Sequence, residues 1–275
     1  MTLDTQSLET AVGWLREADG LLITAGAGMG VDSGLPEFRG NQGMWAAYPA
    51  LGEAKIPFES IANPDAFMKN PALAWGFYGH RLALYRSIEP HAGFAILKRW
   101  ADGMSRGAFV FTSNVDGQFQ KAGFPENAIA ECHGSIHHLQ CTEPCSVDIW
   151  SAARFAPDVD ERACHLKNAF PKCPRCGALA RPNILMFGDW AWLDSRTERQ
   201  LARLDHWLRG VARLAVVEIG AGKALPTVRR FSERHGPRVI RINAREAVIN
   251  PANGVGIEGR AVEALSALDE LLKDR

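Results

Sequence analysis

Several short polar side chains stand together directly after an apolar run of the sequence. Residues 108–111 are apolar, and Thr112, Ser113, Asn114 and Asp116 follow within five positions. A carboxamide and a carboxylate there could hold a ligand, because open parallel sheets bind ligands beyond the carboxyl ends of their strands. The other interpretation is an ordinary turn, since Asn, Asp and Ser are common after strands. This segment alone does not decide between the two.

Four of the six cysteines form two close pairs. Cys141 and Cys145 are separated by three residues, and Cys173 and Cys176 by two. The tight turn in "CPRCG" is typical of a zinc knuckle, in which two thiolates bind one tetrahedral metal ion. The sequence therefore predicts a structural zinc site that fixes a loop-rich module. Cys164 is an alternative ligand, and reduced thiols without a metal are the other possibility.

A glycine-rich segment, TAGAGMGVDSGLPEFRG, occupies residues 24–40 after the first apolar run. Gly26 and Gly28 permit a tight turn and let main-chain N–H groups approach a phosphate. The segment fails the usual dinucleotide pattern G-x-G-x-x-G, because Val31 occupies the third glycine position. As a general motif, this loop is weak evidence for a dinucleotide site.

The elements that would position these residues alternate between helices and buried strands. Helical spacing of apolar residues predicts an amphipathic helix at residues 7–18 and a closing helix at residues 261–272. Continuous apolar strands between helices indicate a parallel sheet covered on both faces. The predicted strands lie in residues 20–28, 108–114, 183–189, 213–222 and 238–244.

Two regions break this alternation. Residues 41–85 hold several aromatic side chains and little β pattern, and residues 136–180 hold both cysteine pairs. We therefore predict an α/β fold: a Rossmann-like parallel sheet with helices on both faces, plus a smaller module of a helical insertion and a zinc-binding loop. The predicted Rossmann-like domain comprises residues 1–40, 86–135 and 183–275, and the module comprises residues 41–85 and 136–182.

The composition argues against several classes of protein. The chain of 275 residues has a formal net charge of zero, which lacks the basic footprint of a nucleic-acid-binding protein. Its longest apolar runs are too short to cross a bilayer. The first residues lack the basic and apolar regions of a signal peptide. We therefore expect a cytoplasmic protein with no nucleic-acid or membrane partner, and the sequence does not indicate its oligomeric state.

The longer string, GAG followed by SGLPEFRG, closely resembles the signature of the sirtuins, the NAD-dependent protein deacylases. Five more segments resemble sirtuin motifs in the order of the family: FTSNVDG, ECHGSIHHLQC, RPNILMFGD, EIGAG and RIN. The resemblance covers about residues 20–265. It implies NAD as co-substrate, an acylated lysine of a protein or peptide as substrate, and a structural zinc ion remote from the reaction.

The resemblance also implies roles for individual residues. Deacylation would yield nicotinamide, O-acyl-ADP-ribose and free lysine, and His133 would be the general base that activates a ribose hydroxyl. Asn114 and Asp116 would hold the nicotinamide-ribose end of NAD. The other residues implied to bind the cofactor are Ala25, Gly26, Ala27, Gly28, Arg39, Ser113, Gly220, Ala221, Gly222, Asn243 and Ala261.

Some of these positions depart from the family pattern. Gly30, Ser113, Ala221 and Gly222 stand where sirtuins carry other side chains. Each change removes a side-chain hydrogen bond worth about 0.5–1.5 kcal/mol. Loss of these bonds could weaken NAD binding, but water or main chain could replace them, so inactivity does not follow.

The acyl group has a predicted contact pair in "WGFYGHR". Tyr78 and Arg81 have the spacing of the Tyr and Arg with which desuccinylases and demalonylases, one class of sirtuins, bind an acidic acyl group. Residues three apart share a helix face, and an Arg there would bind a carboxylate through two hydrogen bonds. The other interpretation is that Tyr78 packs in the core and Arg81 is solvated.

The substrate peptide is predicted to lie near Phe187 and Gly188, in the segment where sirtuins hold it as an added strand. The residues that follow, DWAWLDSRTER, depart from the family. Trp190 and Trp192 could form an unusual wall of the substrate site or could cover the core.

Two other functions stay open. Protein ADP-ribosyl transfer or NAD hydrolysis would fit the altered ribose contacts and the Trp-rich loop, although neither needs the base at His133. An NAD-sensing module without turnover is the non-enzymatic alternative. Retention of Arg39, Asn114, Asp116 and His133 together argues against that alternative.

Overall fold

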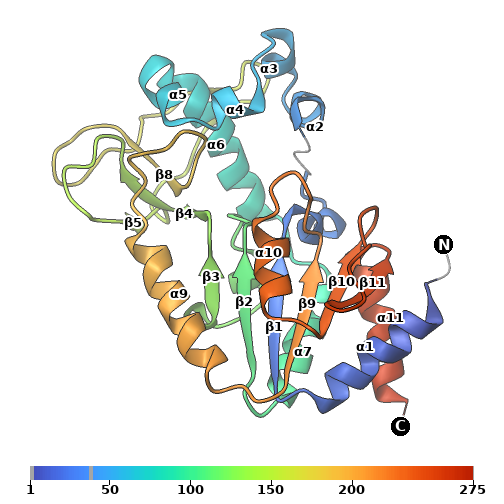
Figure 1. The fold of residues 1–275 in the computed structure, drawn as a ribbon. Coiled ribbons are helices and arrows are strands. Elements are labelled where there is room, and N and C mark those ends of the chain that lie inside the picture. Colours follow the sequence, from blue (N-terminus) through green and yellow to red (C-terminus); the bar gives the residue numbers. More distant parts are fainter. Residues whose placement is uncertain (1–2, 37–39, 275) are drawn as a thin grey trace.

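The computed structural model describes residues 3–36 and 40–274. Figure 1 shows a larger body built on one sheet and a smaller body above it. All six strands of the large sheet are parallel, in the order β11-β10-β9-β1-β2-β3, which confirms the predicted α/β fold. The strands are β1 (Gly20–Ala25), β2 (Ala108–Thr112), β3 (Ile129–Glu131), β9 (Leu214–Ile219), β10 (Val239–Asn243) and β11 (Gly254–Glu258).

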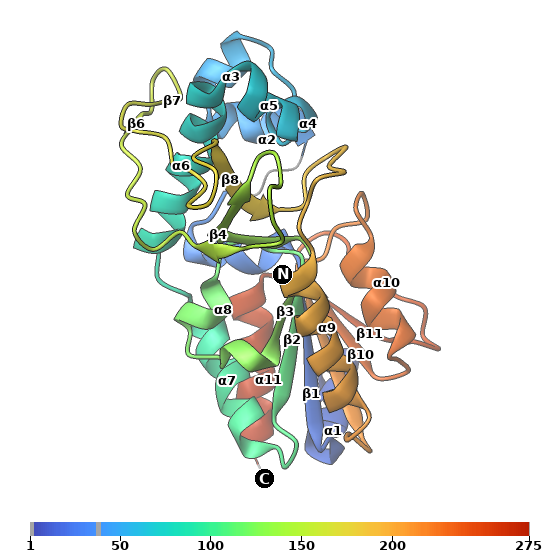
Figure 2. The same ribbon diagram turned by 90° about the vertical axis from the view of Figure 1, so that its left-hand side faces the viewer.

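Helices cover both faces of this sheet (Figures 1 and 2). Side chains alternate along a strand, so Leu21 and Ile23 join the core under one group of helices while Leu22 joins the core on the opposite face. The first group comprises α1 (Thr5–Glu17), α7 (Ala92–Gly103) and α11 (Ala261–Lys273), and the second comprises α9 (Ser195–Leu208) and α10 (Thr227–Arg234). Three short helices lie in connecting segments: η1 (Ala27–Ser33), α8 (Gln118–Lys121) and η2 (Glu126–Ala128).

The two predicted terminal helices are confirmed as α1 and α11. Helix α1 begins where the Asp4 carboxylate accepts a hydrogen bond from the Ser7 N–H, 2.9 Å away, which satisfies one of the free donors of the first turn. No helix within the described residues is both long and apolar enough to span a bilayer.

The smaller body, which we call the small module, contains five helices and two small antiparallel sheets. Trp75 on its longest helix donates from Nε1 to the Ala180 carbonyl at 2.9 Å, which ties the helices to the strand β8 (Ala180–Ile184). The helices are α2 (Gly40–Ala47), α3 (Pro49–Glu53), α4 (Phe58–Ile61), α5 (Pro64–Lys69) and α6 (Pro71–Ser87). The sheets are β5-β4-β8 (Trp150–Ser151, Gly134–Cys141, Ala180–Ile184) and β6-β7 (Val159–Asp160, His165–Leu166).

The strand predicted within residues 183–189 is wrong in extent and in partner. The observed strand, β8, ends at Ile184 and pairs antiparallel with β4 in the small module, not with the large sheet. Pro182 cannot donate a hydrogen bond to a neighbouring strand, which suits the edge position of β8. Apolar content alone predicted a buried strand there, but it carries no information about which sheet receives it.

The edge strand β11 was not predicted, because two glycines dilute its apolar pattern. Both glycines are required by close packing. A Cβ on Gly254 would overlap the main chain of Val239, and one on Gly256 would overlap the main chain of Ala247.

A test of the packing between α6 and the segment that joins β6 to β7 is Gly76→Ala. The added Cβ would overlap the carbonyl oxygen of Cys164, so the helix must shift from the loop. We expect a loss of about 1–3 kcal/mol in the free energy of unfolding, measured by urea denaturation. The matched control is Gly13→Ala in α1, where a Cβ meets nothing within 4 Å. This control should gain up to about 1 kcal/mol from helix propensity. Equal changes in the free energy of unfolding for Gly76→Ala and Gly13→Ala would contradict the close contact between Gly76 and Cys164.

Candidate active site

The carboxyl ends of the central strands bring the predicted site segments to one edge of the sheet. Ala25 at the end of β1 pairs with Thr112 on one side and Ile219 on the other. Thr112 in turn pairs with Glu131, two residues before His133. The glycine loop, the polar segment after β2, His133 and the segment after β9 therefore emerge side by side, as a parallel sheet requires of neighbouring strand ends.

Two glycine segments interlock at this edge. The Gly28 N–H donates to the Gly220 carbonyl at 3.0 Å, and the Gly26 N–H donates to the Ile219 carbonyl at 2.9 Å. A Cβ on Gly26 would lie 2.8 Å from the Gly220 oxygen, and one on Gly28 would lie 2.7 Å from the Gly220 Cα. Gly220 itself has φ of 63°, in the left-handed region that favours glycine. The main chains meet this closely only because all three residues lack side chains.

A cavity of about 270 Å³ lies beside this interlock. Its lining brings together four predicted cofactor residues from distant parts of the chain: Gly28, Gly220, Asn243 and Ala261. The guanidinium-bearing residues Arg245 and Arg260 also line it, as does Asp32. This cavity combines main-chain surface with positive charge, which suits a nucleotide.

Asn243, at the end of β10, uses its carboxamide to join two loops. Its Nδ2 donates to the Ala221 carbonyl at 3.0 Å, and its Oδ1 accepts from the N–H groups of Arg245 and Glu246 at 3.1 and 3.0 Å. In this structure Asn243 therefore shapes the cavity wall by holding the loops after β9 and β10.

The polar residues after β2 are anchored to the glycine loop. Asn114 donates from Nδ2 to the Gly26 carbonyl at 3.0 Å, and the Ser113 N–H donates to the Ala25 carbonyl at 3.1 Å. The Asn114 side chain thus joins this segment to a loop 88 residues away in the sequence, which an ordinary turn does not require.

His133 follows β3 and is partly buried beside Ser113. Burial lowers the pKa of His133 below its usual 6.5, although hydrogen bonding with the Ser113 main chain opposes this shift. The imidazole is therefore neutral at physiological pH and can accept a proton. The His133 carbonyl accepts a hydrogen bond from the Leu185 N–H at 3.0 Å, which fixes the segment after β8 beside it.

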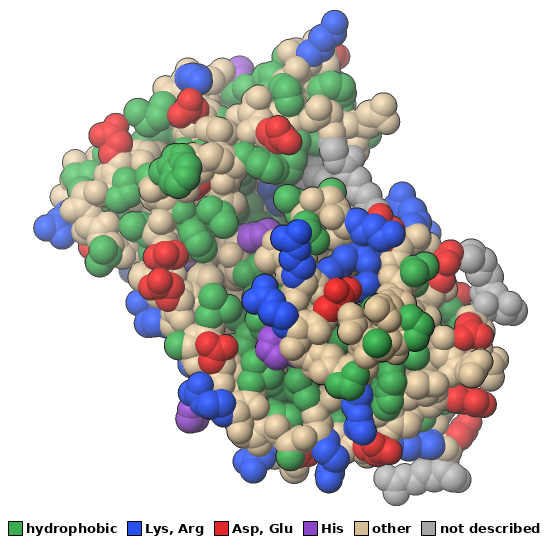
Figure 3. Space-filling view, in the orientation of Figure 1, with side chains coloured by type: hydrophobic (Ala, Val, Ile, Leu, Met, Phe, Trp, Pro, Cys, Tyr) green, Lys and Arg blue, Asp and Glu red, His purple; other side chains and the backbone are tan. Residues whose placement is uncertain are grey.

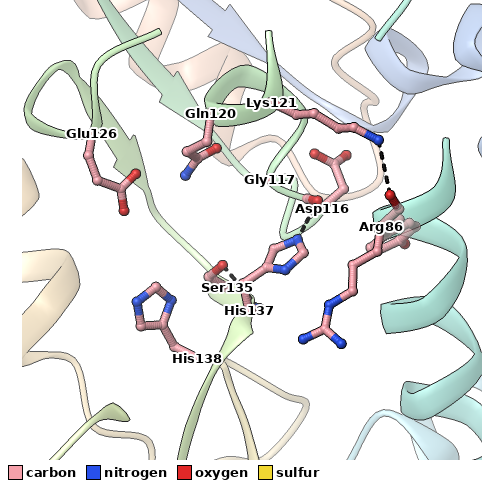
Figure 4. A pocket seen from close by; sticks show the side chains of 10 residues that line it. Arg86, Asp116, Gly117, Gln120, Lys121, Glu126, Ser135, His137 and His138 are labelled. Atoms are coloured by element: carbon pink, nitrogen blue, oxygen red, sulfur yellow. Dashed lines mark hydrogen bonds between the residues drawn. The ribbon is translucent and has the colours of Figure 1, made fainter. Parts of the chain in front are cut away.

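Asp116 is buried, and its carboxyl has an unusual environment. Burial raises the pKa of Asp116 to about 6, the Gln118 N–H that bonds its Oδ1 at 2.9 Å lowers it, and the charge of Glu131 raises it further. Asp116 also lines a second cavity of about 310 Å³, between the end of α6, α8 and β4. Figure 4 shows this cavity.

His137 lines the same cavity as Asp116, and the sequence motifs do not identify it. It lies on β4, and its Nε2 bonds the Asp116 carbonyl at 2.8 Å (Figure 4). Gly117 makes room for this contact, because a Cβ there would lie 2.7 Å from the His137 ring. The small module thereby holds the Asp116 segment. No local sequence signal reports this contact, which joins two elements through a main-chain oxygen.

Tyr78 and Arg81 lie on α6 and are both buried. Arg81 is 9% exposed, so the interpretation of it as a solvated side chain is wrong. Its Nε and Nη2 donate to the Tyr85 hydroxyl at 3.0 and 2.8 Å, and its guanidinium lies 5.3–5.7 Å from the ring centres of Phe77, Tyr78 and Tyr85. Tyr78 stacks on Phe67 with ring centres 5.6 Å apart. Arg81 is therefore a buried cation in an aromatic box of three rings, one of which belongs to Tyr78.

Phe187 and Gly188 lie in the loop after β8, next to the small module. The Phe187 N–H donates to the Ala62 carbonyl at 2.9 Å, and its ring packs edge-on against Phe58 at 5.8 Å. Gly188 has φ of 64°. Of the two tryptophans beyond them, Trp192 is partly buried, whereas Trp190 is exposed.

The structure describes all of the remaining predicted cofactor residues except Arg39. Ala25, Ala27, Ala221 and Gly222 belong to the two segments that carry the glycine interlock. Arg39 lies outside the described residues.

The four paired cysteines form one cluster. Their sulfur atoms all lie within 4.8 Å of one another, with Cys141 and Cys176 3.7 Å apart and Cys145 and Cys173 3.6 Å apart. Tetrahedral zinc with Zn–S bonds of about 2.3 Å places its sulfurs about 3.8 Å apart, so the donor set fits the metal. The four cysteines are thus positioned to bind a structural zinc ion. Cys164 is not part of the cluster and is buried against α6.

Comparisons with known proteins point to one family. The model of the Sir2 family matches residues 26–206. The chain is 34% identical to NAD-dependent protein deacylase 2 of Pyrobaculum aerophilum over 92% of this chain and 91% of the relative. It is 28% identical to the NAD-dependent protein deacylase of Aquifex aeolicus, over 93% and 96% of the two chains.

Solved structures agree with the fold. A mutant Sir2 homologue in complex with ADP-ribose has a TM-score of 0.72 and 25% identity, over 98% of this chain and 97% of that one. A Sir2 homologue in complex with NAD has a TM-score of 0.71 at 24% identity, over 98% and 94% of the two chains.

The zinc assignment predicts different results for two cysteine substitutions. Cys173→Ser removes one thiolate of the cluster, so we expect loss of bound zinc by atomic absorption and a lower melting temperature. Cys164→Ser is the control and should keep its zinc, because Cys164 is outside the cluster. Zinc retained by the Cys173 variant, or lost by the Cys164 variant, would contradict the assignment.

Proposed function

Because this chain belongs to the Sir2 family, we propose that it is an NAD-dependent deacylase of protein lysines. Its products are nicotinamide, O-acyl-ADP-ribose and free lysine. The observation that carries this proposal is the meeting of the glycine loop, Asn114 and His133 at one edge of the sheet. Acylated protein or peptide is the substrate class, as for the relatives named as protein deacylases.

NAD, when bound, supplies the ribose carbon that takes the acyl oxygen as nicotinamide leaves. We assign its adenosine end to the cavity lined by Gly28, Gly220, Asn243 and Ala261. The size of that cavity and its arginines support this assignment. We assign the pyrophosphate to the glycine loop around Gly26, because glycine has no side chain that would keep an anion away from the main chain.

His133 is the proposed general base. Its lowered pKa keeps the ring neutral at pH 7, so it can take a proton from a ribose hydroxyl. Asp116, with its pKa of about 6, is mostly ionised at pH 7 and can accept a hydrogen bond from the carboxamide of nicotinamide. Asn114 orients the ribose from its anchored position on Gly26.

We assign the acyl pocket to the region of Tyr78 and Arg81. A buried guanidinium is a strong partner for a carboxylate, which favours succinyl or malonyl over acetyl groups. The Tyr85 hydroxyl already accepts from Nε and Nη2 of Arg81, so an acidic acyl group would have to share this cation with Tyr85. Comparing acetyl-, succinyl- and malonyl-lysine peptides under the same conditions tests this preference.

The cellular location and the partners of the enzyme are inferred from its composition. We infer a cytoplasmic location, without nucleic-acid or membrane partners. The zero net charge and the absence of disulfides among the described cysteines support this inference.

The central experiment incubates the protein with NAD and the three acyl-lysine peptides and follows products by mass spectrometry. The wild type should release nicotinamide together with O-acyl-ADP-ribose. His133→Ala should lower turnover about a hundredfold or more while NAD still binds, because a positioned base contributes that much. The wild-type pH profile should fall only below about 6.5, since the neutral base is lost by protonation.

The other functions give different products in the same experiment. Free ADP-ribose without peptide turnover indicates NAD hydrolysis, and ADP-ribosylated protein indicates transfer. NAD binding without any product indicates a sensing module. Wild-type turnover by the His133 variant would refute the role of that residue.

A further inference from the structure

The indole of Trp190 is almost fully in solvent. It is 99% exposed, the largest value among the exposed large hydrophobic side chains that the structure describes. A single exposed apolar residue is ordinary, but tryptophan has the largest apolar surface and is enriched where proteins bind partners. The fold gains no core packing from this side chain, so its position requires another explanation.

The loop that presents Trp190 is held rigidly. Arg181 donates from Nη2 to Asp189 Oδ1 at 2.8 Å, and both side chains are completely buried. The same carboxylate accepts from the Ala191 N–H at 3.2 Å and from the Met186 N–H at 3.4 Å. The residues before and after Trp190 are therefore fixed, and a ligand that packs on the indole pays little to order the loop.

The same loop is attached to the proposed general base. The Leu185 N–H bonds the His133 carbonyl, and the Leu185 side chain is itself exposed. Only four residues separate Leu185 from Trp190 in the sequence. A polypeptide that brings an acyl-lysine to His133 must pass close to this loop.

The two rims of the site differ in chemistry. Figure 3 shows a hollow between the small module and the large sheet domain, with mainly hydrophobic and uncharged side chains on the rim of the small module and Lys and Arg side chains over α10. The cavity assigned to the nucleotide contains Arg245 and Arg260 and so belongs to the charged side. The dinucleotide phosphates suit the cationic rim, which leaves the apolar rim for the polypeptide.

We propose that Trp190 is a specificity-determining residue that binds an apolar or aromatic side chain flanking the acyl-lysine of the substrate. This inference rests on the proposed deacylase function and names the kind of sequence that it selects. The indole packs against the flanking side chain and removes apolar surface of both from water. Trp190 takes no part in the chemical step.

The test uses lysine peptides that carry whichever acyl group the wild type removes fastest. The peptides are identical except at one position within three residues of the lysine on either side, where each carries Phe or Gly. Peptide affinity is measured by fluorescence anisotropy without NAD, and kcat and KM are measured with NAD. For one side of the lysine, the wild type should prefer Phe to Gly. Trp190→Ala should raise Kd and KM about tenfold for that Phe peptide, the usual cost of losing an aromatic anchor, with kcat unchanged.

Two further variants make the result specific. Trp190→Phe should keep most of the preference, because it retains an aromatic surface. Val248→Ala removes another side chain that is 80% exposed, on the segment between β10 and β11, and should change nothing. Equal weakening of Phe and Gly peptides by Trp190→Ala, or no preference in the wild type, would overturn the inference.

Failure of the proposed function would look different. If no peptide is deacylated but anisotropy still shows Phe-dependent binding lost in Trp190→Ala, the deacylase function fails and the binding role of Trp190 stands. If peptides are deacylated without any dependence on Trp190, only this inference fails.

Discussion

The close approach of two glycine segments is the constraint on which the active site depends. Gly26 and Gly28 contact Gly220 across the ends of β1 and β9, at separations that exclude any side chain. This contact brings the glycine main chain and the cavity proposed for the nucleotide to one edge of the sheet. It also explains why the loop tolerates departures from the usual dinucleotide pattern, since Val31 lies beyond the interlock, at the cavity lining.

The small module completes the site from the other side. His137 on β4 bonds the main chain of Asp116. Leu185, directly after β8, bonds the main chain of His133. The β4-β8 sheet of the small module therefore fixes two residues of the proposed site. Zinc has no direct part in the chemistry in this account. Its four cysteines close the loops that carry β4 and β8 into position, because Cys141 ends β4 and Cys176 precedes β8 by a few residues.

Features encoded by local spacing could be predicted from the sequence. The cysteine pairs predicted the metal cluster, and the apolar runs predicted the central strands, because both patterns depend on neighbouring residues. Contacts between distant segments could not be predicted in the same way. The assignment of β8 to the smaller sheet, the burial of Arg81 in an aromatic box and the bond from His137 to Asp116 all depend on tertiary packing. The exposure of Trp190 belongs to the same group, since its sequence context allowed either a covered or an open side chain.

The most direct test of the glycine constraint is a calorimetric titration of NAD into the wild type and Gly28→Ala. The added Cβ would lie 2.7 Å from the Gly220 Cα, so the two segments must separate and the nucleotide cavity must change shape. We expect the NAD affinity of Gly28→Ala to be at least about tenfold lower, a cost of about 1.4 kcal/mol, with zinc content and circular dichroism unchanged. The same NAD affinity in both proteins would contradict the claim that this interlock forms the cofactor site.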